Sequence, residues 1–257
     1  MSKLDDAQKL ANIYLDEVVD TIEIRQTYTN ILLPMSGILM GGLHDAGSKA
    51  LVQKALKLKD TEANATFKPL VVHVCGIFEN YIRSVTQAVI EDRFETAESY
   101  WDLDQGFRND HITHAAHVLG HVKKGHVMGA PYPFDVLLRN LGNGLGGKKG
   151  YKLNPEIFTK LMGNPTATRL EALFSSLSLP EPFSDDLGQN TQLQTFFNDK
   201  TRKRVAGSAR KMLDEKIDLR NDIVHGDLTR VVDQTAIEQT VGFFRSLIAG
   251  LNQLVQM

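Results

Sequence analysis

The chain has 257 residues, with 29 Lys or Arg and 31 Asp or Glu, so its formal net charge is −2. A hydrophobic content of 42% and a charged content of 23% are ordinary for a globular protein and exclude global disorder. The near-neutral charge argues against a protein that is basic over its whole surface, but it allows a local basic patch. The single cysteine, Cys75, excludes an internal disulfide and a zinc site built from several thiolates.

The N-terminal sequence lacks the apolar core of a secretory signal. The most apolar stretch, Ile31–Leu43, is 13 residues long and contains Pro34 and Gly37, whereas a membrane-spanning helix needs about 20 apolar residues. We therefore expect a cytoplasmic protein with no membrane partner, and we interpret this stretch as a buried turn between helices.

Apolar residues recur at helical spacing in four parts of the chain. The first two stripes run from Ala7 to Ile22 and from Leu70 to Ala88. A third helix is predicted from about Thr191 to Leu219. The last begins with the capping-box pattern of Thr235 and Glu238 and continues to the C-terminus.

No alternating strand pattern competes with these stripes. The middle of the chain, about Glu95–Asn190, holds most of the prolines, many glycines and only short helical pieces. We therefore predict an all-α, antiparallel bundle of four to five helices, with a long irregular insert between the second and third main helices. Residues 1–257 are expected to form a single domain, in which 1–60 supplies the first helix and a turn, and 191–257 supplies the last two helices.

A glycine-rich segment, Gly142–Gly150, matches the spacing G-x-x-x-x-G-K of a phosphate-binding loop up to Lys148. Lys149 stands where such a loop needs Ser or Thr to hold magnesium, and the chain restarts soon afterwards instead of continuing as a long helix. We interpret the segment as a mobile basic loop. As an alternative, its lysines and Lys152 could contact a nucleic-acid backbone.

Histidines crowd into one short stretch. Five of the eight lie within 16 residues, namely His111, His114, His117, His121 and His126. On a helix, His114, His117 and His121 share one face, and three imidazoles on one face could bind zinc or another transition metal. The stretch has no H-E-x-x-H pattern and no obvious acidic ligand, so we interpret it as an exposed polar segment whose histidines titrate individually.

The segment Leu219–Asp227 places an Arg, an Asn and a His at the end of a predicted helix. Arg220 falls on the apolar stripe that also contains Leu213, Ile217 and Val224. A buried Arg is costly unless it is paired, so this position needs an explanation.

The spacing within this segment limits what one copy can do. Asn221 and His225 lie four residues apart and share a helix face, and Gly226 stands where a helix commonly ends. Arg220 and His225 lie about 140° apart around an ideal helix. One copy therefore need not bring both to one scissile bond, but two copies facing each other in a dimer could.

The residue types suit phosphodiester transesterification. A neutral His can accept a proton from a ribose 2′-hydroxyl, and a protonated His can donate one to the leaving oxygen. An Arg can stabilise the charge that develops on the phosphorane. The alternative is an ordinary helix end, in which Arg220 pairs with a core acid such as Glu79 and His225 interacts with the helix C-terminus.

The sequence R-N-D-I-V-H-G resembles the R-x4-H signature of HEPN domains (higher eukaryotes and prokaryotes nucleotide-binding). The segment Phe78–Arg83 resembles the Glu-bearing helix that precedes this motif in many members. The layout is similar over about residues 65–256. The subgroup with the greatest resemblance is the RiboL-PSP-type HEPN proteins, in which an RN-x3-HG motif lies near the C-terminus.

This resemblance implies a HEPN-like bundle that forms a homodimer and places two motifs in a shared cleft. It implies an endoribonuclease that uses neither a metal nor a cofactor and acts as a bacterial toxin or defence effector, with an antitoxin or defence-system partner. Arg220 and His225 would be the catalytic pair, with Asn221 as a polar helper. Glu79 and Asp222 would be supporting residues.

Six basic residues and no acidic ones lie between positions 200 and 211. They are Lys200, Arg202, Lys203, Arg204, Arg210 and Lys211. Basic residues near a catalytic motif attract phosphates and make binding dependent on salt, so we predict that they bind RNA. The alternatives are a solvated helix face for these residues and, for the whole chain, a non-catalytic HEPN-like module that binds a protein or nucleic-acid partner.

Overall fold

The computed structural model describes residues 3–27, 46–47, 62–123, 134–148, 151–160, 163–227 and 229–256. Throughout these ranges the regular secondary structure is helical and contains no strand, which confirms the predicted all-α class. In the same ranges, no helix is both long enough and apolar enough to cross a membrane. The apolar stretch Ile31–Leu43 lies outside the described residues.

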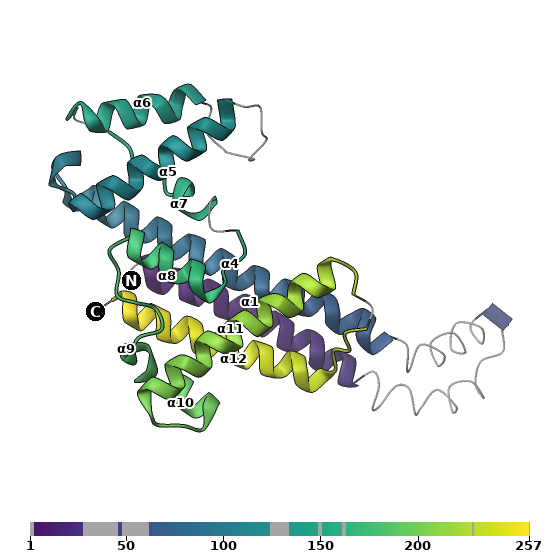
Figure 1. Ribbon diagram of the computed structural model, residues 1–257. Coiled ribbons are helices and arrows are strands. Elements are labelled where there is room, and N and C mark those ends of the chain that lie inside the picture. Colours follow the sequence, from purple (N-terminus) through teal and green to yellow (C-terminus); the bar gives the residue numbers. More distant parts are fainter. Residues whose placement is uncertain are drawn as a thin grey trace.

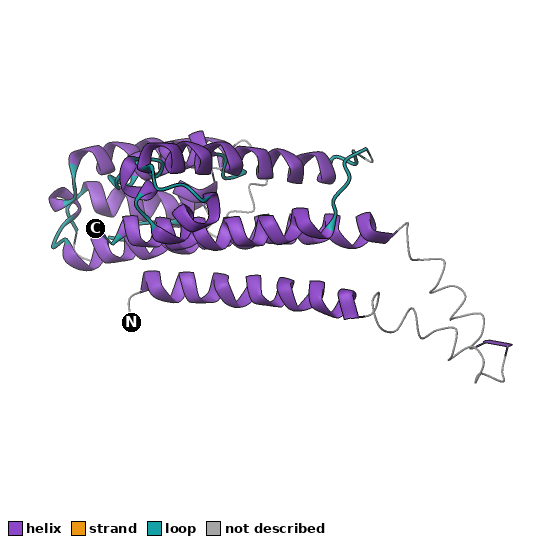
Figure 2. Ribbon diagram, turned by 90° about the horizontal axis from the view of Figure 1, so that it is seen from below, coloured by secondary structure: helices purple, strands orange, loops and turns teal. Residues whose placement is uncertain are grey.

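Four long helices form the body of the molecule: α1 (Lys3–Thr27), α4 (Glu62–Thr96), α11 (Arg202–Val224) and α12 (Gln234–Val255). They lie side by side in two views (Figures 1 and 2). The central helix is α4, because it packs against α1, α11 and α12. The first two predicted stripes therefore correspond to α1 and α4.

The core forms where the apolar stripes of these helices meet. Leu15 on α1, Phe78 on α4, Leu213 on α11 and Phe244 on α12 are all fully buried. The ring centroids of Phe78 and Phe244 lie 4.9 Å apart. Burying a side chain of this kind stabilises a fold by about 1.5–3 kcal/mol, so these contacts hold α4 and α11 in the place that the site requires.

Contacts along α4 and α11 show that the two helices are antiparallel. Near the start of α4, Lys68 Nζ donates to the backbone oxygen of Asp227, which follows α11. Seven residues later, Cys75 Sγ lies 3.8 Å from the backbone oxygen of Lys216, which lies inside α11. The end of α11 is therefore placed over the beginning of α4.

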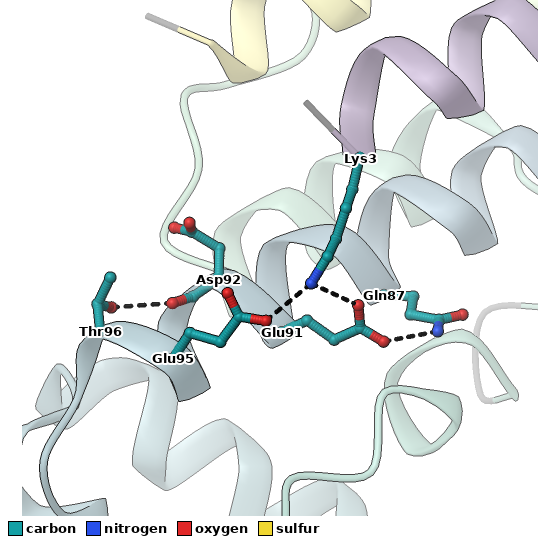
Figure 3. Close-up of polar contacts among 6 residues, drawn as sticks. All are labelled: Lys3, Gln87, Glu91, Asp92, Glu95 and Thr96. Atoms are coloured by element: carbon teal, nitrogen blue, oxygen red, sulfur yellow. Dashed lines mark hydrogen bonds and ion pairs between the residues drawn. The ribbon is translucent and has the colours of Figure 1, made fainter. Parts of the chain in front are cut away.

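An ion-pair cluster joins the start of α1 to the end of α4 (Figure 3). Lys3 Nζ lies 3.2 Å from a carboxylate oxygen of Glu91 and 2.9 Å from one of Glu95. Such solvent-exposed pairs contribute about 0–1 kcal/mol each. Because these pairs join the start of α1 to the end of α4, they show that α1 also runs antiparallel to α4.

The segment between α4 and α11 is more helical than the predicted irregular insert over 95–190. It contains η2 (Tyr100–Asp102), α5 (Gln105–Lys123), α6 (Phe134–Leu145), α7 (Glu156–Lys160), α8 (Ala167–Ser176) and α9 (Asp185–Gly188). Helices α5, α6 and α7 form a lobe beside the end of α4, whereas α8 and α9 pack against α11 (Figure 1). Apart from α5, which has 19 residues, these helices have 12 residues or fewer, so their periodicity is too brief to stand out in the sequence.

The predicted third helix, Thr191–Leu219, is in fact two helices, α10 (Thr191–Phe197) and α11. Asn198 ends α10 in the left-handed conformation, with φ 49°. Asn adopts this conformation more readily than most residues. The basic stretch thus begins a new helix.

The start of α12 also differs from the capping box that the sequence predicted. The N-cap is Asp233, whose carboxylate accepts a 2.8 Å hydrogen bond from the backbone N–H of Ala236. Thr235 is already inside the helix. An Asp is at least as good an N-cap as a Thr, so the helix begins two residues before the predicted start.

Candidate active site at the end of α11

The end of α11 is a Schellman motif, with His225 as the C-cap. The backbone N–H of Gly226 donates to the oxygen of Ile223 at 3.1 Å, and that of Asp227 donates to the oxygen of Asp222 at 2.9 Å. Gly226 has φ +83°, a conformation that Gly adopts without steric cost. The prediction that Gly226 ends the helix is confirmed.

Two side-chain contacts hold the turn that follows. The carboxylate of Asp227 accepts hydrogen bonds from the backbone N–H and the hydroxyl of Thr229, at 2.8 and 2.6 Å, and these lower its pKa. Arg230 reaches back to the Asp222 carboxylate at 2.8 Å. His225 is exposed on this fixed turn, so its imidazole is available to a ligand from solvent.

Arg220 is half-buried and turns toward its neighbour. Its Nη1 donates a 3.1 Å hydrogen bond to Asn221 Oδ1. The apolar stripe that was expected to surround Arg220 stops at Ile217, because the side chain of Val224 is 50% exposed. Arg220 is therefore at the rim of the core, where its guanidinium can face both protein and solvent.

The acid that an ordinary helix end would pair with Arg220 has another partner. Glu79 binds Arg83 on its own helix at 2.5 Å. Between α4 and α11 lies the buried Cys75, whose pKa burial raises to about 12, with the positive charge of Arg220 opposing that rise. The thiol thus stays protonated beside the Arg220 guanidinium and offers it no negative charge.

A residue that the sequence did not single out completes the group. Asn164, in the turn before α8, donates a 2.8 Å hydrogen bond from Nδ2 to Asn221 Oδ1. Arg169 Nη1 in turn donates to the backbone oxygen of Asn164 at 3.3 Å. The only sequence signal at this position is the dipeptide of Asn164 and Pro165, which marks a turn but predicts no contact with α11.

The predicted RNA-binding residues lie away from the motif. Arg202 begins α11 and His225 caps its end, so about 34 Å of helix separates them at 1.5 Å per residue. Lys200, Arg202 and Lys203 are exposed near that beginning. The structure thus places these three residues at one end of α11 and the motif at the other.

The other three predicted RNA-binding residues form ion pairs. Arg204 binds Asp199 at 2.8 Å. Arg210 binds Glu171 of α8, also at 2.8 Å. Lys211 lies 3.6 Å from Glu215. Part of the positive charge that the sequence shows is therefore balanced locally.

The first four histidines of the stretch lie on one helix, α5, as the shared face of His114, His117 and His121 needs. The stretch is not an exposed polar segment throughout. His111 is 3% exposed, and its Nδ1 lies 3.1 Å from the Tyr100 hydroxyl. Its ring packs against both Phe107 and Phe158, which also stack on each other. Burial lowers the pKa of His111 to about 4, so this imidazole is a neutral core group at physiological pH.

The remaining histidines of the stretch differ in burial. His114 is half-buried with its ring edge against Phe158, and burial lowers its pKa as well. His117 is exposed. The side chain of His121 and all of His126 lie outside the described residues. Among the residues that are described, no three or more His, Cys, Asp and Glu side chains are grouped so as to hold a metal ion.

The glycine-rich segment is the end of a helix rather than a mobile loop. Gly142–Leu145 belongs to α6, and Gly147 follows in the left-handed conformation with φ +62°. Gly144 packs so closely on the Tyr100 ring that a Cβ there would lie 3.1 Å from it. The glycines thus serve helix packing and termination. Lys148 is exposed beyond them, and Lys149 lies outside the described residues.

Comparison with known proteins rests on one match. The family model described as RiboL-PSP-HEPN matches residues 48–256, which includes α4, the turn that carries Asn164, and the whole of the motif. No curated protein and no solved structure matches the chain. Because the family model covers most of its length, the chain belongs to the RiboL-PSP-HEPN family.

Proposed function

We propose that this chain is a metal-independent endoribonuclease of HEPN type that cleaves RNA at a site shared by two copies. The observation that carries the proposal is the end of α11. There an exposed His225 sits on a rigid turn, one helical turn from Asn221, which binds the half-buried Arg220. The family membership supports the same assignment.

The proposed reaction is an internal transesterification. The ribose 2′-oxygen attacks the adjacent phosphorus, the O2′–P bond forms, and the P–O5′ bond breaks to leave a 2′,3′-cyclic phosphate and a 5′-hydroxyl. The imidazole of His225 takes the proton from the 2′-hydroxyl or gives one to the leaving oxygen. The Arg220 guanidinium donates hydrogen bonds to the phosphoryl oxygens as their charge builds up.

The proposed site needs a second copy of the chain, because Arg220 and His225 lie about 140° apart around the end of α11. Val224 and Val231, on either side of His225 in the sequence, are 50% and 76% exposed. Single exposed valines are common on protein surfaces, so the homodimer rests on the family membership rather than on these side chains. A second copy seated here would bring its own motif close, so that Arg220 of one copy and His225 of the other could act on one phosphodiester.

The other predicted residues take supporting roles. Asn221 fixes Arg220, and Asp222 holds the turn through Arg230. Glu79, paired with Arg83 on α4, would support the neighbouring packing. Lys200, Arg202 and Lys203 would bind the RNA backbone at a distance from the cut. We also propose that the protein acts as a toxin or defence effector and that an antitoxin or another defence-system protein is its partner.

The test is cleavage of a mixed-sequence RNA by the purified protein in excess EDTA. Wild type is expected to cleave, and His225→Ala to lose about 100-fold or more of that activity. His117→Ala, which removes an exposed histidine of α5, is the control and should cleave like wild type. Equal cleavage by wild type and His225→Ala would overturn the assignment.

A second candidate function is a non-catalytic module that binds a protein or nucleic acid. The half-burial of Arg220 and its hydrogen bond to Asn221 favour it, because they also fit a structural residue. In that case wild type would show no ribonuclease activity, and Arg220→Ala would lower the melting temperature strongly. The EDTA assay combined with thermal unfolding separates the two functions.

A further inference from the structure

We infer that Asn164 is a positioning residue for this reaction, which acts through Asn221 on Arg220. The inference rests on the proposed function and deepens it, because it assigns part of the site to the segment between α4 and α11. Asn164 lies 57 positions before Asn221 and outside the R-x4-H motif. The amide of Asn164 does not itself meet the substrate in this scheme.

One oxygen links the three side chains. Asn221 Oδ1 accepts from Arg220 Nη1 at 3.1 Å and from Asn164 Nδ2 at 2.8 Å. A carboxamide oxygen has two lone pairs, so both are used. The terminal torsion of an Asn side chain is soft, and the bond from Asn164 therefore decides which way the oxygen of Asn221 points and where it holds the Arg220 guanidinium.

The turn that carries Asn164 is itself held firmly. The backbone oxygen of Asn164 accepts hydrogen bonds from the N–H of Thr166 at 2.9 Å and from Arg169 Nη1 at 3.3 Å. Gly163 has φ +59°, and a Cβ there would lie 2.6 Å from Arg169 Nη1. Gly adopts this conformation without steric cost, so Gly163 and the two hydrogen bonds hold the backbone from which the Asn164 amide reaches Asn221.

Further contacts anchor the same segment along α11. The Asp214 carboxylate accepts a 2.8 Å hydrogen bond from the backbone N–H of Ala167, the first residue of α8. Arg210 binds Glu171 of α8. Positions 210, 214 and 221 are spaced as i, i+4 and i+11, which places them on one face of α11. This face is lined with groups that bind the segment, and the contact with Asn164 lies nearest the motif.

The docking contacts and the positioning contact can be separated by mutation. Asn164→Ala removes the donor to Asn221, and Asn164→Asp removes the same donor at nearly constant volume. Glu171→Ala breaks a docking contact 11 residues, or about 16 Å, up α11 from Asn221. If Asn164 only helped the segment to dock, Glu171→Ala would impair the reaction in the same way.

The experiment measures kcat and KM for RNA cleavage in EDTA, together with the melting temperature of each variant. We expect both Asn164 variants to lower kcat by about tenfold at nearly unchanged KM, short of the roughly 100-fold loss that a misplacement of about 1 Å can cause. Glu171→Ala should keep the wild-type kcat. The double variant Asn164→Ala/Asn221→Ala should be no slower than Asn221→Ala alone, because the two residues act through one contact.

The possible failures point to different errors. A wild type that does not cleave RNA would overturn both the function and the inference. Cleavage by wild type, with an unchanged kcat in the Asn164 variants, would overturn the inference alone. An equal loss in Glu171→Ala, or independent losses from Asn164→Ala and Asn221→Ala, would also overturn it, since Asn164 would then act through docking or on its own.

Discussion

Histidines in α5 and at the end of α11 lie in opposite surroundings. In α5, His111 is enclosed by Tyr100, Phe107 and Phe158, and its pKa falls to about 4. At the end of α11, His225 is exposed on a turn held by hydrogen bonds. The first histidine stays neutral inside the fold, whereas the second can meet a ligand.

The difference shows that the number of histidines does not locate the chemistry. In the crowded stretch, aromatic neighbours of α5 bury the first histidine, His111, whereas His117 stays exposed. The solitary histidine stayed outside, because it caps a helix beside the polar residues Arg220 and Asn221. A histidine can be reached by substrate only where its surroundings leave it exposed, and the sequence alone does not report those surroundings.

The largest expected effect comes from removing the charge at the end of α11. Arg220→Gln keeps a polar group beside Asn221 but loses the positive charge. We expect kcat for RNA cleavage to fall by about 10²–10³-fold, the range seen when one stabilising donor to a developing oxyanion is lost. The matched change in the other helix, His114→Ala, should leave kcat near that of wild type. Initial rates at saturating RNA measure kcat for both variants. Similar losses of kcat in the two variants would contradict the contrast drawn between α5 and the end of α11.

The second effect is a loss of stability at acid pH, caused by the buried His111 of α5. The pKa of His111 is about 4 in the fold, below the ordinary value of 6.5, so between these values the unfolded chain binds more protons than the folded one. Stability therefore falls as the pH drops from about 6.5 to 4, by up to about 3 kcal/mol for this group.

The measurement is urea unfolding at several pH values in that window. His111→Phe keeps an aromatic ring against Phe107 and Phe158 but cannot titrate. We expect it to lose less stability than wild type between pH 6.5 and 4. Parallel curves for wild type and variant would show that His111 is not the neutral core group described for α5.

The sequence predicted the long helices well and their ends less well. The stripes of α1 and α4 follow from apolar spacing, because each buries a long continuous face. The break at Asn198 and the cap at Asp233 each depend on one residue whose backbone conformation is a local choice. Periodicity averages over such positions, so it merged α10 with α11, and the capping-box pattern placed the start of α12 two residues too late.

The candidate site was predictable only in its local part. The position of Gly226 predicted the end of α11, and the R-x4-H motif identified Arg220 and His225 as candidate site residues. The role of Asn164 arises from a contact across 57 positions, and the burial of His111 arises from rings on other elements. Both depend on the tertiary arrangement, which no short-range pattern encodes.

A third, smaller effect is expected at the other end of α11. Lys203 is exposed, whereas Arg210 is bound to Glu171. If Lys203 contacts a phosphate, Lys203→Ala should reduce the salt slope of single-stranded RNA binding by about 0.7. Arg210→Ala should change that slope less and should lower stability by about 0.2–1 kcal/mol. Titrations of a 2′-deoxy-substituted strand at several salt concentrations give the slopes, and the reverse ranking would contradict the proposed division of these cations.

The smallest effect should come from the turn that carries His225. Asp222→Asn weakens the contact with Arg230, a pair with side chains 34% and 56% exposed, so the loss of stability should be about 0–1 kcal/mol. At roughly 2–4 °C per kcal/mol for a chain of this size, the melting temperature should change by only a few degrees. Hydrogen exchange should nevertheless quicken at the amides of Gly226 and Asp227, because these close the end of α11. Unchanged exchange there, or faster exchange spread equally into α5, would show that the rigidity around His225 does not come from this contact. Faster exchange confined to the turn would show that a local hydrogen-bonded structure, which α5 lacks, holds His225 at the surface.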